Sequence, residues 1–266
     1  MLLQIKDYGG YMLKKFVKYQ FLFEELVKRD FKKKYKRTAL GMLWSLIAPL
    51  LQLAVMALVF THLFGRTTEY YVIYLFSGNL VFTYYSDATQ GGMRSLLQNS
   101  GIFSKVDVPK YMFLLSRNIQ SLINFGLSLC VYFVFVFAYG IEFRWSFVLL
   151  IFPIMCIMVF NIGVGMVLSA LYMFFRDIEY LYSVFCMLIS YLSAIFYNVT
   201  AFPETIRKLF YINPIYTYIT YFRKIVIYNQ IPSLKYHLLC IFYALVMIGI
   251  GSLIYKKYNY KFLYYV

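Results

Sequence analysis

Between Arg37 and Arg66 the chain reads TALGMLWSLIAPLLQLAVMALVFTHLFG, a run of 28 residues without a charge. A transmembrane helix needs about 20 consecutive, predominantly apolar residues, so this run is long enough to cross a bilayer. The whole chain has the same character: of its 266 residues, 62% are hydrophobic and 14% are charged, and the mean hydropathy is +0.67. A soluble domain of this length cannot bury so much apolar surface. The composition therefore indicates an integral membrane protein and excludes a soluble enzyme, a disordered chain and a disulfide scaffold.

Charged residues divide the rest of the chain into further apolar runs. Four of them, at residues 118–141, 145–175, 180–203 and 236–255, contain 20 or more residues without a charge. A weaker run of 17 uncharged residues begins at Tyr70 and ends before Asp87. We therefore predict an all-α integral membrane protein in which residues 38–266 form a six-span domain, with transmembrane helices at about residues 40–64, 70–92, 113–139, 146–175, 180–200 and 236–255.

One apolar run is too short to cross a membrane. Residues 209–222 form a stretch of 14 uncharged residues that contains Asn213-Pro214 and lies between two basic pairs. This length is typical of a re-entrant or interfacial segment, whose backbone must be sheltered by protein or line a wet cavity. We expect such a segment on the outer side, before the last span.

The distribution of lysine and arginine predicts the orientation of the chain. If the N-terminus is cytoplasmic, the inner segments carry 19 of the 26 basic residues and the outer segments carry 7. Basic residues favour the cytoplasmic side, so we expect both termini there. The net charge of +15 fits the same interpretation, because basic flanks anchor spans and face anionic membrane lipids. Binding to nucleic acid is not expected.

Residues 1–37, before the first span, separate apolar from basic side chains. On a helical wheel Phe16, Phe23, Val27 and Phe31 fall in one arc, and most of the lysines fall in the opposite arc. The pattern predicts a cytoplasmic amphipathic helix that lies in the headgroup layer. The alternative is a solvated basic arm.

The sequence lacks the signatures of catalysis. No lysine is followed by Ser or Thr, so the chain has no P-loop for ATP. His62 and His237 are far apart in sequence, and no metal site is predicted. The spans hold no paired carboxylates; Asp87 is expected to be interfacial or to face a partner helix rather than to relay protons. These absences favour a transport subunit that is driven by another protein.

Five segments form an ordered set along the chain. They are ELVKRDFKKKYKRTALGMLW at residues 25–44 with Ala48-Pro49-Leu50 after it, NSGIFSKVDVPK at 99–110, FRDIEYL at 175–181, Asn213-Pro214 followed by Tyr221-Phe-Arg223, and the basic aromatic tail from Tyr255. In order and spacing the set resembles the type-2 ABC exporter permeases of the polysaccharide family, the membrane subunits for O-antigen, capsule and teichoic acid export.

This resemblance implies a homodimeric permease that pairs with two copies of a separate ATPase subunit. ATP and magnesium would bind to the ATPase, so no cofactor is expected in this chain. The cargo would be a polyprenyl-linked glycan, exported across the cytoplasmic membrane of a bacterium. It would pass through a channel between the two permeases.

The resemblance also assigns roles to cytoplasmic residues. The loop after the second span would contact the ATPase through Ile102, Phe103, Lys105, Val106 and Pro109. A second, smaller contact would involve Arg176 and Asp177. The matching part of the interfacial helix contains Glu25, Arg29, Asp30 and Lys33. The alternatives are an ordinary loop between helices and, for Arg176 and Asp177, a local ion pair.

Aromatic residues make up 22% of the chain. Tyrosine rings stack on the C–H faces of sugars and offer a polar tip, so some could line a polysaccharide channel. The candidates are Tyr84, Tyr85, Tyr172, Tyr191 and Tyr197. The alternative is that they belong to interfacial belts or face lipid.

Paired glycines indicate where helices pack closely. Gly163 and Gly165 lie in the fourth predicted span, and Gly249 and Gly251 lie in the sixth. Small residues let helix backbones approach each other in membranes. Their spacing of two does not match a dimerisation motif.

Three other functions stay open on the sequence alone. A related ABC permease could export a drug or a lipid with the same fold. A membrane-embedded enzyme of glycolipid assembly would need an essential polar constellation, and a secondary carrier would need ionisable residues at mid-membrane. The identity of the glycan and the type of cell envelope are not encoded in any motif of the chain.

Overall fold

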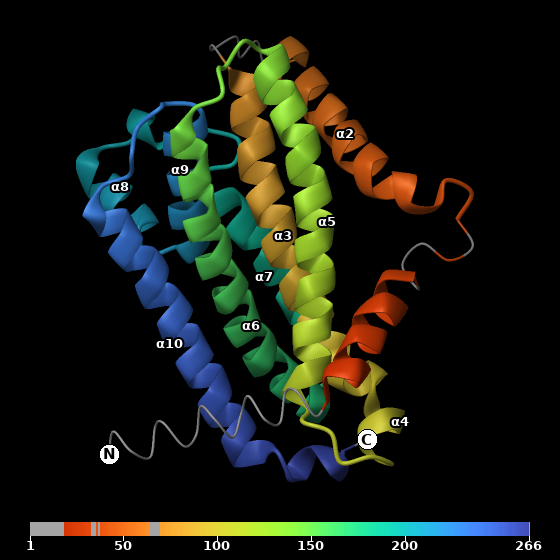
Figure 1. Ribbon diagram of the computed structural model, residues 1–266. Coiled ribbons are helices and arrows are strands. Elements are labelled where there is room, and N and C mark those ends of the chain that lie inside the picture. Colours follow the sequence, from red (N-terminus) through yellow and green to blue (C-terminus); the bar gives the residue numbers. More distant parts are fainter. Residues whose placement is uncertain (1–18, 33–35, 37, 64–69, 266) are drawn as a thin grey trace.

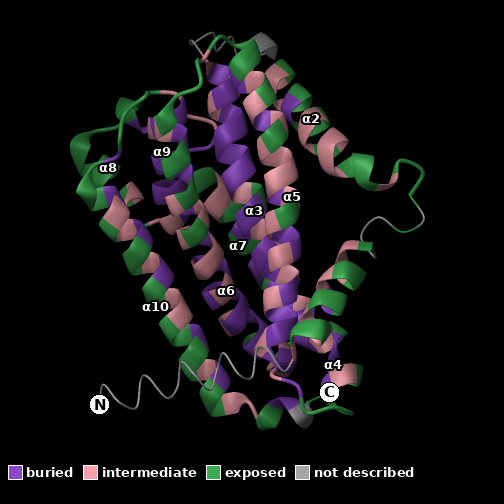
Figure 2. Cartoon of the chain, in the orientation of Figure 1, coloured by how far each residue is buried: buried purple, intermediate pink, exposed green. Residues whose placement is uncertain are grey.

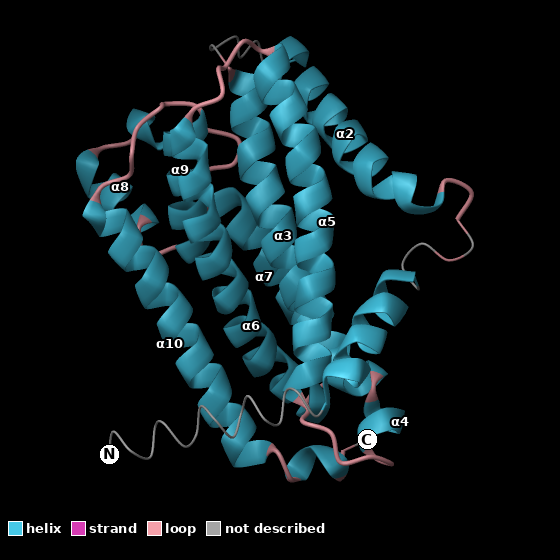
Figure 3. Ribbon diagram, viewed as in Figure 1, coloured by secondary structure: helices cyan, strands magenta, loops and turns pink. Residues whose placement is uncertain are grey.

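The computed structural model describes residues 19–32, 36, 38–63 and 70–265. In these ranges the chain consists of helices joined by loops and turns and contains no strand (Figure 3). The first described helix covers residues 19–32, so the rest of the predicted interfacial helix, including Lys33, lies outside the described residues.

The elements that follow are mostly long helices (Figure 1). The principal ones are α2 (Trp44–Ala57), α3 (Tyr71–Gln98), α5 (Tyr111–Ala138), α6 (Ile151–Phe174), α7 (Ile178–Leu192) and α10 (Leu234–Tyr258). Shorter helices are α4 (Ser100–Phe103), α8 (Glu204–Phe210) and α9 (Pro214–Val226). Single turns at Gly41–Leu43, Trp145–Leu150, Val199–Ala201 and Lys261–Leu263 are 3₁₀-helical, and a π-helical stretch at Leu58–Leu63 extends α2.

Four helices in the described residues are long and apolar enough to cross a membrane: Gly41–Phe60, Tyr111–Ala138, Trp145–Phe174 and Leu234–Tyr258. They correspond to the first, third, fourth and sixth predicted spans. The chain is thus a multi-pass membrane protein. Helix α3 has 28 residues, a length of about 42 Å, but it carries more polar side chains than the other four. It occupies the centre of the bundle between α5 and α6, where most of its residues are buried (Figure 2).

Helix α7 is shorter than the predicted span at 180–200. It ends at Leu192 after 15 residues, about 22 Å, because the chain turns at Ala194, whose φ is +53°. The turn is held from outside: Asn213 Nδ2 donates to Ser193 Oγ at 2.9 Å, and Arg223 Nη1 donates to the Ala194 carbonyl at 2.8 Å. Both donors are distant in sequence, so the uncharged run 180–203 gave no sign of the turn.

The predicted re-entrant segment forms a turn and a buried helix. Asn213 caps α9 by accepting a hydrogen bond from the Ile215 N–H at 3.0 Å, and Pro214 occupies the first turn of the helix. Most of α9 is buried against α3, α6 and α10. Its backbone is therefore sheltered by protein, as a re-entrant segment requires.

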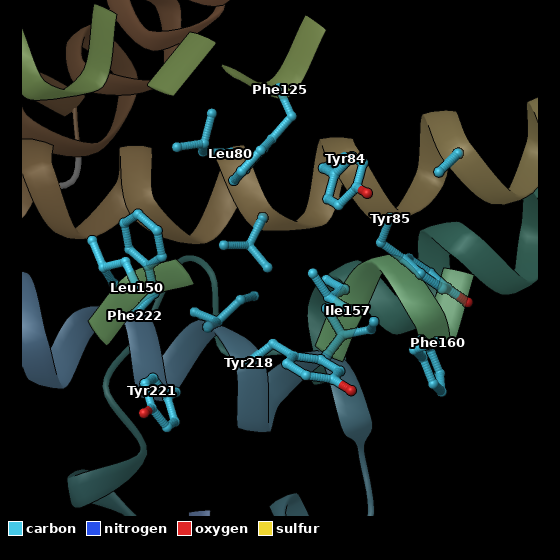
Figure 4. Packing of buried hydrophobic residues seen from close by; sticks show 14 of the residues in the cluster. Leu80, Tyr84, Tyr85, Phe125, Leu150, Ile157, Phe160, Tyr218, Tyr221 and Phe222 are labelled. Carbon is cyan, nitrogen blue, oxygen red and sulfur yellow. The ribbon is translucent and has the colours of Figure 1, made fainter. Parts of the chain in front are cut away.

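The core fills the space between α3, α5, α6 and α9. Figure 4 shows Tyr84 and Tyr85 of α3, Phe125 of α5, Phe160 of α6 and Tyr218 of α9 among its side chains. Helix α10 packs on α6 through a face that contains Cys240, Ala244 and Gly251. At this contact a Cβ atom on Gly163 would lie 2.4 Å from the Met247 backbone carbon, so only glycine fits. The close packing predicted for Gly163 and Gly251 is confirmed, whereas Gly249 has open space around it.

Candidate functional site

The segments predicted to be cytoplasmic meet at one end of the bundle, which we call the basic end (residues 19–32, 94–117, 174–179 and 256–265). Lys110 Nζ donates to the Asn259 carbonyl at 2.7 Å, and the Phe174 ring packs against Tyr258 and Phe262. Burial lowers the pKa of Lys110. Figure 1 shows these segments together at the foot of the bundle, away from α8 and α9.

At the basic end the predicted coupling loop has an inner and an outer side. Phe103 ends α4 and is only 5% exposed, because its ring packs on Phe113 with centroids 6.0 Å apart. Val108 is also buried. Lys105 and Val106 are exposed, Val106 to 55%. The loop is therefore anchored through Phe103 and Val108 and presents Lys105 and Val106 outward.

The remaining two loop candidates lie between these extremes. Ile102 and Pro109 are half-buried, and Pro109 is in the non-helical stretch between α4 and α5. The break that proline was expected to cause between the second and third long helices is present.

The helix over residues 19–32 is tied to this loop. Arg29 Nη2 donates to Asn99 Oδ1 at 2.8 Å, and Gln120 Nε2 of α5 donates to the Asp30 carbonyl at 2.7 Å. The buried Leu26 belongs to the same apolar cluster as Phe103. Glu25 faces outward and pairs with Lys28 at 3.0 Å. A movement of the loop would therefore displace this helix and α5 as well.

The turn between α6 and α7 lies at the same end. Arg176 and Asp177 are both exposed and form no ion pair with each other in the described structure; instead, the Arg176 guanidinium lies 5.3 Å from the Tyr172 ring centroid. The Tyr172 hydroxyl donates to Glu179 at 2.8 Å, and Arg94 of α3 forms an ion pair with Glu179. The hydrogen bond from Tyr172, together with Arg94, lowers the pKa of Glu179.

A polar groove runs along the middle of α3, between α2 and α5. It has a volume of about 470 Å³, and its polar lining residues are Thr38, Ser45, Gln52, Asn79, Thr83, Tyr84, Asp87, Ser121, Asn124 and Ser128. Gln52 Nε2 donates to Asn79 Oδ1 at 3.3 Å, and Ser121 Oγ donates to Asp87 Oδ2 at 2.9 Å. Asp87 thus faces a partner helix, one of the two positions expected for it. Apolar side chains such as Trp44, Phe76 and Phe125 complete the walls.

Of the five candidate channel tyrosines, the structure places one in this groove. Tyr84 lines it and directs its hydroxyl toward Asn118 Oδ1 at 3.4 Å. Tyr85 is buried in the core beside Tyr182, and Tyr172 lies at the basic end. Tyr191 is exposed on α7, and the Tyr197 hydroxyl donates to the Tyr191 carbonyl at 2.7 Å.

Two features of the site were not found by sequence reasoning. The groove residues Gln52, Asn79 and Ser121 are single polar residues in apolar runs, and only the packing of α2 against α3 and α5 brings them together. Arg223 was interpreted as the charged boundary of a short segment, but it is buried. The sequence did contain a signal for the groove. An isolated amide side chain within a membrane span is energetically unfavourable, so its presence there indicates a polar contact or a functional role.

The described residues contain no cluster of His, Cys, Asp or Glu that could hold a metal ion. His237 Nε2 is 2.8 Å from the Tyr221 hydroxyl, and its ring packs on Phe152. The side chain of His62 lies outside the described residues.

Comparison with known proteins agrees with this architecture. The sequence profile of the ABC-2 type transporter family matches residues 22–227. Two O-antigen export system permease proteins RfbA from Klebsiella pneumoniae are 28% and 26% identical over 247 residues, which cover 91% of this chain and 95% of each relative. A protein of the same name from Myxococcus xanthus is 25% identical over 224 residues, 84% of this chain and 86% of that relative.

The family match spans more than half of the chain and includes residues 22–32 of the first described helix, the predicted coupling loop, the groove and α9. A permease of this family is a transport protein that implies a partner ATPase. The chain belongs to the ABC-2 type transporter family as a membrane permease subunit.

Proposed function

We propose that this chain exports a lipid-linked polysaccharide across the cytoplasmic membrane of a bacterium. In this proposal two copies of the chain form the channel and two copies of an ATPase bind ATP and magnesium. All six predicted spans cross the bilayer, with α3 and α7 as the second and fifth, and both termini are cytoplasmic. Residues 209–222 are re-entrant from the outer side.

The observation that carries the proposal is the polar groove along α3. Amide and hydroxyl groups at the middle of membrane helices are costly unless they meet polar partners, and a glycan is a dense array of hydroxyl groups. Asp87 is the one acidic side chain of the described lining, and Ser121 already donates to it. The lining therefore suits a hydroxyl-rich chain better than a small inorganic ion.

The position of α2 supports a pathway on this side of the bundle. Figure 1 shows α2 leaving α5 at an angle, and Leu53 is its one buried residue among those described. The groove is thus bordered by a helix with few contacts inside its own chain. In a dimer, the groove and the exposed apolar faces of α2 and α7 would be covered by the second copy.

The basic end supplies the proposed link to the ATPase. Lys105 and Val106 face outward, and Arg176 and Asp177 are exposed at the same end of the bundle. Phe103 is unsuitable as a test of contact because a charge at this buried position would unfold the loop. Val106→Asp is better placed, since its side chain is exposed.

The first test is purification of the tagged chain from native membranes in mild detergent, with mass spectrometry of what is retained. We expect a stoichiometric P-loop ATPase and a lipid-linked glycan. Val106→Asp should reduce recovery of the ATPase, while Ile231→Asp, at an exposed position in the segment before α10 and far from the loop, should not. Recovery of the chain alone across several detergents would contradict the proposal.

A second candidate function is the export of a lipid or drug by the same fold. The apolar part of the groove, with Trp44, Phe76 and Phe125, favours it. Asn79→Leu separates the two, because it removes a polar group from the groove, whereas Gln90→Leu on the same helix lies outside it. If the cargo is a glycan, Asn79→Leu should cause lipid-linked glycan to accumulate inside cells and Gln90→Leu should not.

A further inference from the structure

A second cavity lies at the opposite end of the bundle, among α8, α9 and the start of α10. Its volume is about 410 Å³. Three basic side chains line it, Arg207, Arg223 and Lys224, and the described part of the lining contains no acidic side chain. Five tyrosines share the walls: Tyr74, Tyr211, Tyr216, Tyr228 and Tyr236.

The charge of Arg223 has no carboxylate partner in the described structure. The residue is 3% exposed, and its guanidinium donates to Ser77 Oγ and to the carbonyls of Tyr74, Ala194 and Ile195 at 2.8–3.3 Å. It also lies 3.4 Å from the Tyr74 ring centroid. These neutral partners hold the side chain in place but do not neutralise the positive charge of the guanidinium. A buried charge of this kind is unfavourable, and an anion in the adjoining cavity would offset it.

The other two cations are also without carboxylates among the described residues. Lys224 Nζ lies 4.5 Å from the Tyr236 ring centroid. Arg207 and Lys208 are neighbours on α8, but Lys208 pairs with Glu204 at 3.1 Å and does not line the cavity. Arg207 lines the cavity and has no ion pair. Three basic residues therefore line one cavity, and Glu204, which pairs with Lys208, is not part of its described lining.

We propose that this cavity binds a sugar that carries a negative charge, as a phosphate or a carboxylate. Arginine and lysine recognise both groups through charge-assisted hydrogen bonds, and tyrosine rings supply flat faces for the pyranose. A volume of about 410 Å³ is within the range of small-ligand pockets. The inference rests on the proposed export of a glycan and identifies the cargo as one with an anionic residue, which the cavity holds at the exit of the pathway.

The test uses the full-length chain in nanodiscs of phosphatidylcholine, a lipid without net charge, and isothermal titration calorimetry. The probes are glucose 1-phosphate, glucuronate, glucose and inorganic phosphate. We expect at least one of the two charged sugars to bind about tenfold more tightly than glucose and inorganic phosphate. Binding of glucuronate alone assigns the charge to a carboxylate, and binding of glucose 1-phosphate alone assigns it to a phosphate.

Two results would overturn the inference. If glucose or inorganic phosphate binds as tightly as the charged sugars, the cavity does not select an anionic sugar. If nanodiscs with phosphatidylglycerol abolish the binding of the charged sugars, the cavity is a site for an anionic lipid headgroup.

Neighbouring residues on α8 provide a matched pair of variants. Arg207→Gln should weaken the charged sugar about tenfold, whereas Lys208→Gln should change its Kd less than about twofold. Equal losses in the two variants would contradict a site in the cavity. Thermal unfolding of each variant verifies that it is folded. The binding assay needs no ATPase, so it can fail while the pull-down still supports export, and it can succeed while the pull-down contradicts it.

Discussion

Helix α10 and the helical stretch Gly41–Phe60, which contains α2, are both apolar and long enough to cross a membrane, yet the bundle holds them in different ways. Helix α10 lies against α6 so closely that a Cβ atom on Gly251 would be 2.8 Å from the Gly163 carbonyl oxygen. A hydrogen bond of 2.6 Å between Ser169 and Tyr255 adds to the contact. Helix α2 buries Leu53 alone among its described residues, and Leu51, Val55 and Leu58 are more than half exposed.

The difference shows that hydropathy does not indicate which neighbour a helix has. In lipid, apolar surface alone gives little reason for two helices to associate, so small residues and polar contacts decide the packing. The α6–α10 contact has both and forms a fixed part of the molecule. Helix α2 has small residues such as Ala48 and Ala54 and a hydrogen bond from Gln52 to Asn79 of α3, yet Leu53 is the one residue that it buries among those described. Its exposed face is available to lipid or to a second copy.

The largest effect is expected where α6 and α10 meet. Gly163→Ala places a methyl group 2.4 Å from the Met247 backbone, which cannot move without separating the helices. We expect the free energy of unfolding to fall by about 3 kcal/mol, the upper end of the range for overpacking. The yield of monodisperse protein should fall strongly. Gly249→Ala is the control, because nothing lies within 4 Å and alanine favours a helix. Equal destabilisation of the two variants in thermal unfolding would contradict this packing.

The next effect concerns α2 and is smaller. Leu53→Ala shortens a side chain that is 3% exposed and should lower the free energy of unfolding by about 2 kcal/mol. Val55→Ala changes a position that is 63% exposed and should stay within about 0.5 kcal/mol in the isolated chain. Thermal unfolding of both variants in detergent makes the comparison. If Val55→Ala reduces the amount of dimer that is purified but leaves the thermal stability of the isolated chain unchanged, α2 contacts the second copy through its exposed face.

The same contrast explains which helices could be predicted from the sequence. The predicted spans 113–139, 146–175 and 236–255 fall within about three residues of α5, of Trp145–Phe174 and of α10, because charges mark their ends. Helix α3 begins one residue after its predicted start and extends to Gln98. Its C-terminal part is polar yet buried at the centre of the bundle, so hydropathy understates its length.

Long-range contacts account for what sequence reasoning missed. The turn that shortens α7 depends on Arg223 and Asn213, and the inward position of Phe103 depends on Phe113. The position of the predicted coupling loop follows from the charges around it, but which of its residues face outward does not. Likewise, the groove exists only where Gln52, Asn79 and Ser121 meet from three helices.

Helix α9 is an intermediate case, held by one buried cation. A Cβ atom on Gly78 would lie 2.6 Å from Arg223 Nη2, so Gly78→Ala should displace the guanidinium from its carbonyl partners. Because the clash is with a side chain that can shift, we expect the free energy of unfolding to fall by only about 1–2 kcal/mol. Gly126→Ala on α5, with open space around it, is the control. Thermal unfolding without and with a charged sugar measures the stability of each variant and the binding of the sugar to the cavity that Arg223 lines. Equal stability of the two variants would contradict this role of Arg223.

The smallest effect is expected at the basic end, where Glu179 links α7 to α3 and α6. Its pKa is lowered from 4.5 by the Tyr172 hydroxyl and by Arg94, so the ionised form stabilises the folded state. This contribution is present above the pKa of the unfolded chain and is lost as the pH falls through the lowered value. Because the Arg94–Glu179 pair is partly exposed, the effect should stay below about 1 kcal/mol.

Glu179→Gln provides the comparison, since glutamine keeps the shape and has no charge to lose. At pH 7 the variant should unfold at a slightly lower temperature than the parent chain. The difference should shrink as the pH falls below the pKa of an unfolded glutamate and vanish once the pH is below the lowered pKa of Glu179, where the parent carboxylate is protonated. A difference that persists at low pH would assign the stabilisation to packing of the side chain rather than to its charge. In that case α7 would be held at the basic end by the same kind of contact that holds α10, and the contrast with α2 would extend to a second helix.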